Sequence, residues 1–336
     1  MIGRNLGFVT TQAQRLSDLF SQDGYAVTST SSKVNRYRRL GDISWTLISR
    51  AREMDVVVLE IYGGSSFVVE DVASLLGNRF RRPVVMWLHG GALPEFTARF
   101  PRWSHRVLSR GAALVAPSPF LARAMAQRGF VARVIPNTLD LSEYSFRARR
   151  VLRPRLFWMR TFHPVWNPEM AVRVLARVRR EYPDATLVMA GQDKGWQRRT
   201  ETLAFEMGLG GAVRFAGFLG VQEKVREAGH ADIYVNTNRI DNMPVAVLEA
   251  CAMGLPVVST NVGGVPDLLD HERTGLLTPD DDDEAMARQV IRLLHEPDLA
   301  ARLSTNARCL AERSSWESVR PQWERLFQEL TTADSR

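Results

Sequence analysis

Residues 241–266 read DNMPVAVLEACAMGLPVVSTNVGGVP and decide the fold. The pattern predicts a loop, a short apolar helix that Pro244 opens and Gly254 closes, a strand over 256–260, and a tight turn at Gly263-Gly264. A helix start presents backbone N–H groups to an anion, and a glycine turn lets a ligand approach the backbone closely. Together these features favour a phosphate-binding site.

Two carboxylates, Asp241 and Glu249, lie in this stretch with seven residues between them. Glu249 falls in a helix that is otherwise apolar, so its charge needs partners, and the hydroxyls of a ribose would supply them. Spacing alone also allows two plainer interpretations. Asp241 could be a turn-forming residue, and Glu249 could pair with a cation or with the helix dipole.

Short apolar runs alternate with amphipathic stretches on both sides of this segment. The pattern predicts strands near 6–9, 25–29, 55–61, 84–88, 113–116 and 132–135, and then near 156–160, 185–190, 213–216, 232–237 and 256–260. Helices are expected between them, including 43–53 and 97–109. This alternation is typical of α/β proteins with doubly wound parallel sheets, here two Rossmann-like domains that face a central cleft.

The domain boundaries follow from a break in the pattern, because the charged stretch around Pro154 has no periodicity. We expect a first domain over 1–145, a linker over 146–155, and a second domain over 156–315. Residues 316–336 are expected to form a helix that packs back toward the first domain.

Composition excludes several classes of protein. The chain has 336 residues, 45% of them hydrophobic and 24% charged, which is typical of globular domains and not of a disordered chain. The longest apolar runs, such as Val84–Leu88, are far too short to span a bilayer, and the start of the sequence does not resemble a signal peptide. The two cysteines, Cys251 and Cys309, exclude a disulfide scaffold and a cysteine zinc site.

Basic residues are concentrated in the first half of the chain. Residues 1–150 hold 21 Arg and Lys against 11 Asp and Glu, whereas residues 151–336 hold 23 against 26. A basic half attracts lipid headgroups, nucleic acid or phosphorylated substrates, or is simply a solvated surface. Arg99–Arg110 fits an interfacial membrane helix and equally a core-facing helix with a basic face. Nucleic acid is not an expected partner, because few aromatic residues alternate with the basic ones.

The segment around Asp241 and Glu249 resembles the retaining glycosyltransferases of family 4, the glycosyl transferases group 1, which have the GT-B fold. The likeness continues through HERTGLLT (271–278), and upstream through VRFAGF (213–218), LFWMRTF (156–162) and VIPNTLDL (134–141). It covers most of the chain and is weakest over residues 1–80.

The resemblance implies a donor site for a nucleoside diphosphate sugar. Glu249 would bind the ribose, Asp241 the hydroxyls of the donor sugar, and Arg160 the diphosphate. Arg160 could equally be a strand-end arginine paired with a carboxylate. The other implied donor-binding residues are Asn242, Met243, Pro244, Val245, Gly263, Gly264 and Gly217.

A histidine in the first domain completes the implied set. His89 stands in MWLHGG (86–91), directly after an apolar strand, where open α/β domains bind ligands. In the family, a histidine at this place faces the donor sugar, and we therefore expect Asp241, Arg160 and His89 to be catalytic. The alternative for His89 is a hydrogen-bonded turn residue, and Trp158 and Trp166 are expected to be packing residues.

Three features depart from the family pattern. Relatives carry a lysine shortly after the arginine, where this chain has Val165–Asn167; Lys194 or Arg198 could replace it. Asp241 stands where glutamate is commoner, and Thr10-Thr11-Gln12 replaces a Gly-Gly loop.

The acidic run Asp280–Asp283 precedes a predicted helix. Negative charge is favourable at a helix N-terminus, so we assign the run to the helix dipole, and we expect neither metal nor cofactor.

The expected function is retaining transfer of a sugar to a hydroxyl of a glycan, a lipid-linked saccharide or a small metabolite. Such work would serve polysaccharide or glycoconjugate synthesis in a bacterial cytoplasm, or at the inner face of the membrane if the basic half binds anionic lipid. Two alternatives stay open: an inactive GT-B protein that serves as a binding or assembly partner, and a nucleotide-sugar epimerase.

Overall fold

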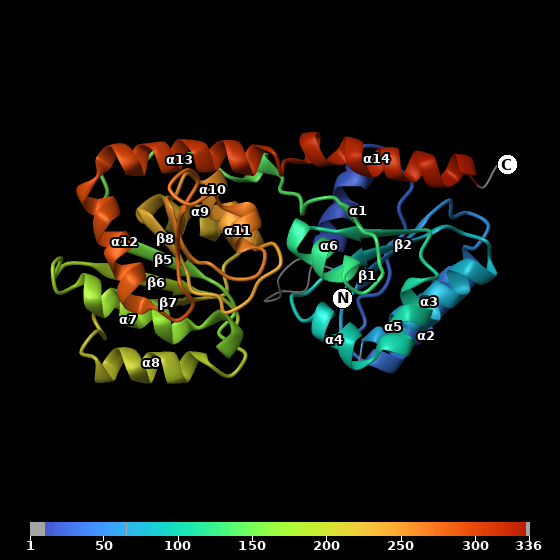
Figure 1. Cartoon of the computed structure of the whole chain (residues 1–336), viewed down its shortest axis with the longest axis horizontal. Coiled ribbons are helices and arrows are strands. Elements are labelled where there is room, and N and C mark those ends of the chain that lie inside the picture. Colours follow the sequence, from blue (N-terminus) through green and yellow to red (C-terminus); the bar gives the residue numbers. More distant parts are fainter. Residues whose placement is uncertain (1–10, 65, 334–336) are drawn as a thin grey trace. The chain divides into compact units, whose positions relative to one another are not determined.

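The computed structural model describes residues 11–64 and 66–333 and divides them into two compact units (Figure 1). The first unit contains the described residues up to Thr138 together with those from Trp316 onward, and the second is Leu139–Ser315. The strand predicted at 6–9, and Thr10 of the altered first loop, lie outside the described residues.

The first unit is built on a parallel sheet whose four strands lie in chain order. The strands are β1 (Val57–Ile61), β2 (Val84–Leu88), β3 (Ala113–Ala116) and β4 (Arg133–Val134). Its helices are α1 (Gln12–Gln22), α2 (Arg36–Ser49), α3 (Phe67–Arg79), α4 (Leu93–Arg99), α5 (Pro101–Leu108), α6 (Pro119–Ala126) and α14 (Trp316–Ala333).

The second unit is built on a six-stranded parallel sheet in the order β10-β9-β8-β5-β6-β7. Its strands are β5 (Arg155–Met159), β6 (Thr186–Ala190), β7 (Val213–Gly217), β8 (Ile233–Asn236), β9 (Val257–Thr260) and β10 (Leu276–Thr278). Its helices are α7 (Pro168–Val178), α8 (Gln197–Glu206), α9 (Val221–His230), α10 (Val245–Ala252), α11 (Val265–Leu268), α12 (Asp283–His295) and α13 (Pro297–Glu312), with 3₁₀ turns η1 (Leu141–Glu143) and η2 (Pro164–Trp166). The chain starts at β5, builds outward to β7, and then returns to build β8 to β10 on the other side. The prediction of two parallel-sheet α/β domains is confirmed, and the strand order of the second sheet is doubly wound.

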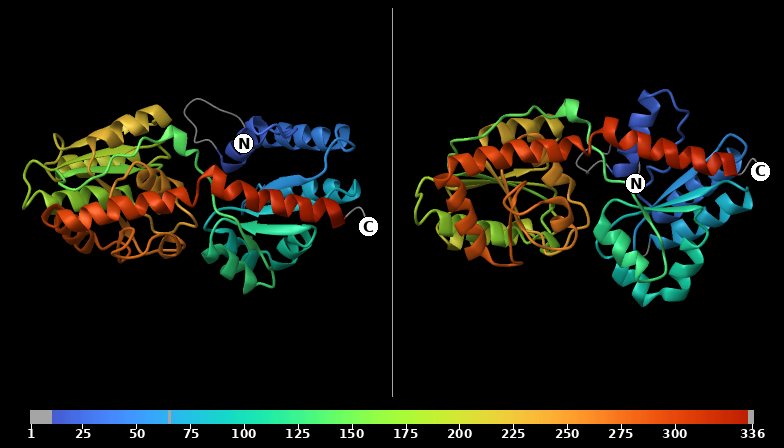
Figure 2. Two further views of the ribbon diagram at one scale, coloured as in Figure 1. Left: turned by 90° about the horizontal axis from the view of Figure 1, so that it is seen from above. Right: turned by 45° about the horizontal axis from the view of Figure 1, so that its top comes forward.

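Both sheets are covered on their two faces, as the ribbons in Figure 2 show. Alternate side chains of a strand point to opposite faces, so each strand feeds two hydrophobic clusters. In β5, Leu156 and Trp158 enter one cluster while Phe157 and Met159 enter the other. In β2, Trp87 belongs to the cluster that also contains Trp323 of α14. This two-sided burial explains why the strands read as continuous apolar runs.

Two local predictions in the first unit are wrong. Residues 25–29 form no strand, and Tyr25 and Val27 are exposed instead of being buried on a sheet. The single helix predicted over 97–109 is two helices, α4 and α5. The chain leaves helical geometry at Phe100, because a residue before proline is driven out of the α region, and Pro101 then starts α5.

The basic segment 99–110 turns most of its apolar side chains inward, with Phe100, which is 39% exposed, as the exception. Val107 and Leu108 are fully buried in the core, and the indole of Trp103 donates to Asp71 at 2.7 Å. Arg106 and Arg110 both pair with the same carboxylate. Of the two interpretations of this segment, the core-facing helix with a basic face is therefore the one that the structure has.

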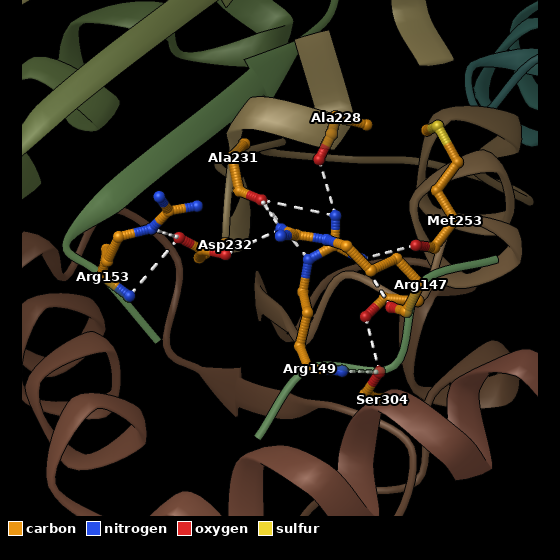
Figure 3. A network of polar contacts seen from close by, with 9 residues as sticks. Arg147, Arg149, Arg153, Ala228, Ala231, Asp232, Met253 and Ser304 are labelled. Carbon is orange, nitrogen blue, oxygen red and sulfur yellow. Dashed lines mark hydrogen bonds and ion pairs between the residues drawn. The ribbon is translucent and has the colours of Figure 1, made fainter. Parts of the chain in front are cut away.

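The stretch predicted as a linker, 146–155, lies inside the second unit, because the division falls between Thr138 and Leu139. Its arginines explain the difference (Figure 3). The buried guanidinium of Arg149 donates to the backbone carbonyls of Arg147, Ala228, Ala231 and Met253. Arg147 and Arg153 flank it and both pair with the carboxylate of Asp232. A charged, aperiodic stretch is thus fixed largely by polar contacts, with Leu152 as its buried apolar residue.

Candidate functional site

The candidate site of the second unit lies where the strand order reverses, between β5 and β8. Open α/β sheets bind ligands at this switch point, outside the carboxyl ends of the strands. Arg160 is the first residue after β5, and Asn238 and Asp241 stand in the loop that follows β8. The sheet therefore brings together residues that are about 80 positions apart in the chain.

Arg160 and Asp241 form a nearly buried ion pair. Their side chains are only 15% and 10% exposed, and the guanidinium Nη2 donates to Asp241 Oδ2. Asn238 donates to the same oxygen at 2.7 Å. Burial raises the pKa of the Asp241 carboxyl, and the charge of Arg160 opposes that rise. In this structure Arg160 thus pairs with a carboxylate, as the alternative had it, and the partner is Asp241, which we also expected to be catalytic.

The guanidinium of Arg160 also stacks on Trp166. Its carbon lies 3.8 Å from the centre of the indole ring, a distance at which a cation is attracted to the ring face. The Trp166 carbonyl accepts from the hydroxyl of Thr237 at 2.8 Å, and that hydroxyl accepts from the indole of Trp158 at 2.9 Å. Trp158 is a core residue as predicted, whereas Trp166 does more than pack, since it positions the arginine.

Glu249 is held by a lysine and a tyrosine. Its side chain is 4% exposed, and both carboxylate oxygens accept from Lys224 Nζ at 2.9 Å. The hydroxyl of Tyr144 donates to Oε1 at 2.9 Å. The ion-pair interpretation of Glu249 therefore describes its contacts in this structure. Lys224 comes from α9 and Tyr144 from the end of η1, so three separate segments meet at this carboxylate.

Two glycines let the backbone close tightly around these residues. Gly263 has φ +54°, and a Cβ on it would lie 2.1 Å from the carbonyl oxygen of Asp241. The next N–H, of Gly264, donates to that oxygen at 2.8 Å. Gly191 follows β6, and a Cβ there would lie 1.8 Å from the carbonyl oxygen of Arg160. The predicted Gly263-Gly264 turn thus lies against the backbone of Asp241. Gly191 lies in the same way against the backbone of Arg160.

The remaining predicted donor-binding residues have the following places. Asn242 donates its backbone N–H to the carboxylate of its neighbour Asp241 at 2.8 Å. Met243 is buried, Pro244 is the N-cap of α10, and Val245 is its first residue. Gly217 ends β7 with φ +68°, and its carbonyl accepts from the N–H of Gly191 at 2.8 Å.

His89 belongs to the first unit, where it follows β2. It is 6% exposed, and burial lowers the pKa of its imidazole to about 3, so the ring is neutral at physiological pH. Its ring stacks on Tyr62, with the centroids 5.4 Å apart. Its Nε2 is buried without a hydrogen-bond partner and lies 3.6 Å from Glu60 Oε1. Among the described residues this nitrogen is therefore a buried polar atom without a partner, which is uncommon and needs an explanation.

A second buried carboxyl group, that of Glu70, lies near Tyr62 in the same polar cluster. Glu70 Oε1 accepts from the backbone N–H of Tyr62 at 3.3 Å. Burial raises the pKa of Glu70 to about 8 and also raises that of Glu60. The carboxyl ends of β1 and β2 are therefore polar, but they carry less charge at neutral pH than their residues suggest.

The carboxylates of the acidic run Asp280–Asp283 pair with arginines or cap the start of a helix. Asp281 pairs with Arg173 and Arg239, and Asp283 pairs with Arg173 and Arg177. Asp282 caps α12. Within the described residues, no group of three or more His, Cys, Asp or Glu is placed to hold a metal ion.

Several residues of the site were not predicted. Gly191 could have been found, since a glycine directly after an apolar strand is a common feature of ligand-binding edges. Lys224 is one of three lysines in the chain, yet nothing in the sequence links it to Glu249. Nothing in the sequence marks Tyr144 or Asn238 as residues of the site.

The two parallel-sheet units and the switch-point site define an α/β protein of the GT-B class. Residues 149–309 match the family model described as glycosyl transferases group 1. The match covers somewhat less than half of the chain, so it shows that this part of the second unit is similar to that family.

Curated relatives match part of the chain. A D-inositol 3-phosphate glycosyltransferase of Saccharomonospora viridis is 33% identical over 161 residues, which are 46% of this chain and 37% of that protein. A GDP-mannose-dependent alpha-(1-6)-phosphatidylinositol monomannoside mannosyltransferase of Mycobacterium tuberculosis is 25% identical over 205 residues, covering 59% of this chain and 51% of that protein. The match thus spans about half or less of the length of these relatives.

Solved structures share the fold over nearly the whole chain. Sucrose-phosphate synthase from Thermosynechococcus elongatus has a TM-score of 0.79 at 18% identity, covering 96% of this chain and 93% of that one. Anabaena Alr3699/HepE in complex with UDP-glucose has a TM-score of 0.76 at 17% identity, covering 94% and 89%. At these identities the likeness shows the fold alone.

Proposed function

We propose that this chain is a retaining glycosyltransferase that moves a sugar from a nucleoside diphosphate sugar to a hydroxyl acceptor. The observation that carries the proposal is that the Arg160–Asp241 pair and the Lys224–Glu249–Tyr144 group lie in the same unit, beside the switch point of its sheet. Relatives in this family are named as glycosyltransferases, and a structural neighbour holds UDP-glucose.

In this proposal, Arg160 binds the diphosphate. A planar guanidinium can donate to phosphate oxygens through two N–H groups and stabilise the charge of the leaving group. Its Nε is buried without a hydrogen-bond partner, which leaves a donor free for a ligand. A bound diphosphate would add a second anion beside Asp241, whose carboxylate then accepts from hydroxyls of the donor sugar.

Glu249 and Lys224 form the ribose end of the proposed site. A carboxylate that already accepts from Lys224 and Tyr144 is fixed in one orientation, so its remaining lone pairs can accept from ribose hydroxyls without reordering the side chain. The start of α10, from Asn242 to Val245, and the turn at Gly263-Gly264 complete the donor site, with Gly217 at the end of β7.

We propose that departure and attack occur on the same face of the sugar. The bond between the anomeric carbon and the phosphate oxygen breaks first, and the acceptor oxygen then bonds to that carbon. The acceptor proton moves to the leaving phosphate. Arg160 stabilises the charge that develops on the phosphate, and the neutral imidazole of His89 is proposed to contact the donor sugar. This route uses no metal and no enzyme-bound nucleophile.

The proposed acceptor is a hydroxyl of a glycan, a lipid-linked saccharide or a small metabolite, and the proposed place is the cytoplasm, including the inner face of the membrane. No helix of the described residues is long and apolar enough to cross a bilayer. The relatives named above act, by their names, on inositol phosphate and on a phosphatidylinositol mannoside.

Thermal unfolding with UDP, GDP, ADP and TDP tests the donor site directly. A nucleotide at about 100 times its Kd should add about 2.7 kcal/mol to the stability of the second unit. The shift should be lost in Glu249→Gln and kept in Glu206→Gln, an exposed carboxylate on α8. If no nucleotide stabilises the wild type, or if Glu249→Gln responds like the wild type, the proposed donor site is wrong.

The contacts of Arg160 and Glu249 within the chain also favour a second candidate, a GT-B protein that binds a partner without catalysis. Both charged groups are already paired, so the protein is stable without a donor. Mass spectrometry of donor incubated with the protein separates the alternatives. Free sugar or transfer product means catalysis, an epimerised donor means an epimerase, and unchanged donor that nevertheless binds means a non-catalytic protein.

A further inference from the structure

Helix α2 has two apolar faces, and only one of them packs on the protein. Ile43 and Leu47 belong to the core of the first unit. Tyr37, Trp45 and Ile48 lie on a different face, because 100° per residue places them within one quarter of the helix circumference. These three side chains are 71%, 70% and 50% exposed. A surface helix ordinarily has one apolar stripe, so the second one requires a partner.

The chain around this second stripe is strongly basic. Residues 33–52 contain six basic residues and a single acidic one, Asp42. Arg36 lies over the ring of Tyr37, 5.1 Å from its centre, and donates to the hydroxyl of that tyrosine. Arg39 donates to the carbonyls of Lys33 and Val34, which ties the basic loop to the helix. Val34 itself is 74% exposed.

We infer that this face of α2, together with the loop before it (Lys33, Val34, Arg36, Tyr37, Arg38, Trp45 and Ile48, the α2 face), docks on an anionic lipid surface. Tyrosine and tryptophan rings prefer the depth of the lipid headgroups, where their apolar body is buried and their polar edge stays wet. Arginine beside them gains from the negative potential of anionic lipid. A narrow apolar stripe with cations at its edge suits shallow insertion and not a deep protein groove.

The inference moves the membrane contact away from segment 99–110, where Trp103, Val107 and Leu108 pack in or against the core, to a helix that composition did not single out. It rests on the proposed function only for its purpose, which would be to bring the enzyme to a lipid-linked acceptor. The docking itself depends on α2 alone and can be measured without donor or acceptor.

Vesicle flotation tests the inference. Wild-type chain should float with vesicles of phosphatidylglycerol and phosphatidylcholine at low salt, less at high salt, and not with phosphatidylcholine alone. The double variant Tyr37→Ser/Trp45→Ser should bind at least about tenfold more weakly. The double variant Arg36→Gln/Arg38→Gln should lose about tenfold or more, because each lost charge contributes several-fold. Phe205→Ser, which removes an exposed aromatic from α8, should bind like the wild type.

Three results would overturn the inference: no binding of the wild type at low salt, equal binding of the Tyr37/Trp45 variant, or a concentration-dependent dimer that this variant abolishes, which would make a second copy the occupant. Nucleotide stabilisation measured on the same samples keeps the two proposals apart. Vesicle binding without nucleotide binding refutes the donor site and leaves the α2 face in place.

Discussion

Gly263 lacks a side chain at a point where one would collide with the backbone of Asp241. Gly263→Ala should destabilise the second unit by more than the roughly 1–2 kcal/mol that left-handed geometry costs any alanine. The matched control is Gly208→Ala, at φ +70° with nothing within 4 Å of the added Cβ. Chemical denaturation of both variants measures the difference. If the two variants lose equal stability, the collision of the added Cβ with the Asp241 backbone costs nothing and the expectation is wrong.

Glu70 should make the first unit less stable as the pH rises. Its ordinary pKa near 4.5 in the unfolded chain increases to about 8 in the folded one. Between these values the folded state binds more protons than the unfolded state, so the free energy of unfolding falls with increasing pH and the loss is complete above pH 8. Glu70→Gln should remove this decline, whereas exposed Glu95→Gln should leave it unchanged. Denaturation of each variant from pH 5 to 9 provides the comparison.

Single residues were predictable where local chemistry specifies them. Gly254 and Gly263 adopt the positive φ that their turns require, and the paired carboxylates lie in the predicted loop and helix. The partners of those carboxylates were not predictable. Lys224 contacts Glu249 because α9 and α10 contribute to the same hydrophobic cluster on one face of the sheet. Such contacts depend on the folded topology and not on local spacing.

At the scale of elements, Arg149 connects the ends of two helices. Its guanidinium donates to carbonyls at the C-terminal ends of α9 and α10 (Figure 3), and burial lowers its pKa to about 9, so it still carries its charge at neutral pH. Arg149→Met would leave buried carbonyls without donors, at about 1–3 kcal/mol for each group that water cannot reach.

We therefore expect Arg149→Met to destabilise the second unit by at least about 3 kcal/mol. Arg150→Met, which breaks an exposed pair with Asp298, should change stability by less than about 1 kcal/mol. Urea denaturation followed by tryptophan fluorescence measures both. A loss below 1 kcal/mol in Arg149→Met would mean that water replaces the guanidinium.

Elements were predicted best where they are buried. The strands at 84–88 and 113–116 agree with β2 and β3 to the residue, because buried parallel strands are short apolar runs with sharp ends. Predictions were wrong where the apolar or polar pattern of the sequence did not match the burial of the residues. Residues 25–29 have strand-like side chains without a sheet to bury them, and segment 146–155 looks like a linker because its contacts are polar.

At the scale of the whole molecule, α14 supports the first unit from the far end of the chain. Trp323 is 1% exposed, and its ring lies 5.1 Å from that of Trp87 in β2. Trp323→Ala should destabilise the first unit by about 3–5 kcal/mol and leave the second unit unchanged. Calorimetry with and without the stabilising nucleotide assigns the two transitions. The expectation fails if the nucleotide-sensitive transition moves instead.

The return of α14 to the first unit sets an order of events during synthesis. The described strands of the first sheet leave the ribosome before any strand of the second, yet the layer of their core that α1 and α14 share is incomplete until residues 316–333 have been translated. The side of Trp87 that Trp323 covers stays open for as long as the second unit is being made. The part of the protein that is synthesised first is therefore completed last, and a nascent chain stopped before Trp316 would be a natural client for chaperones.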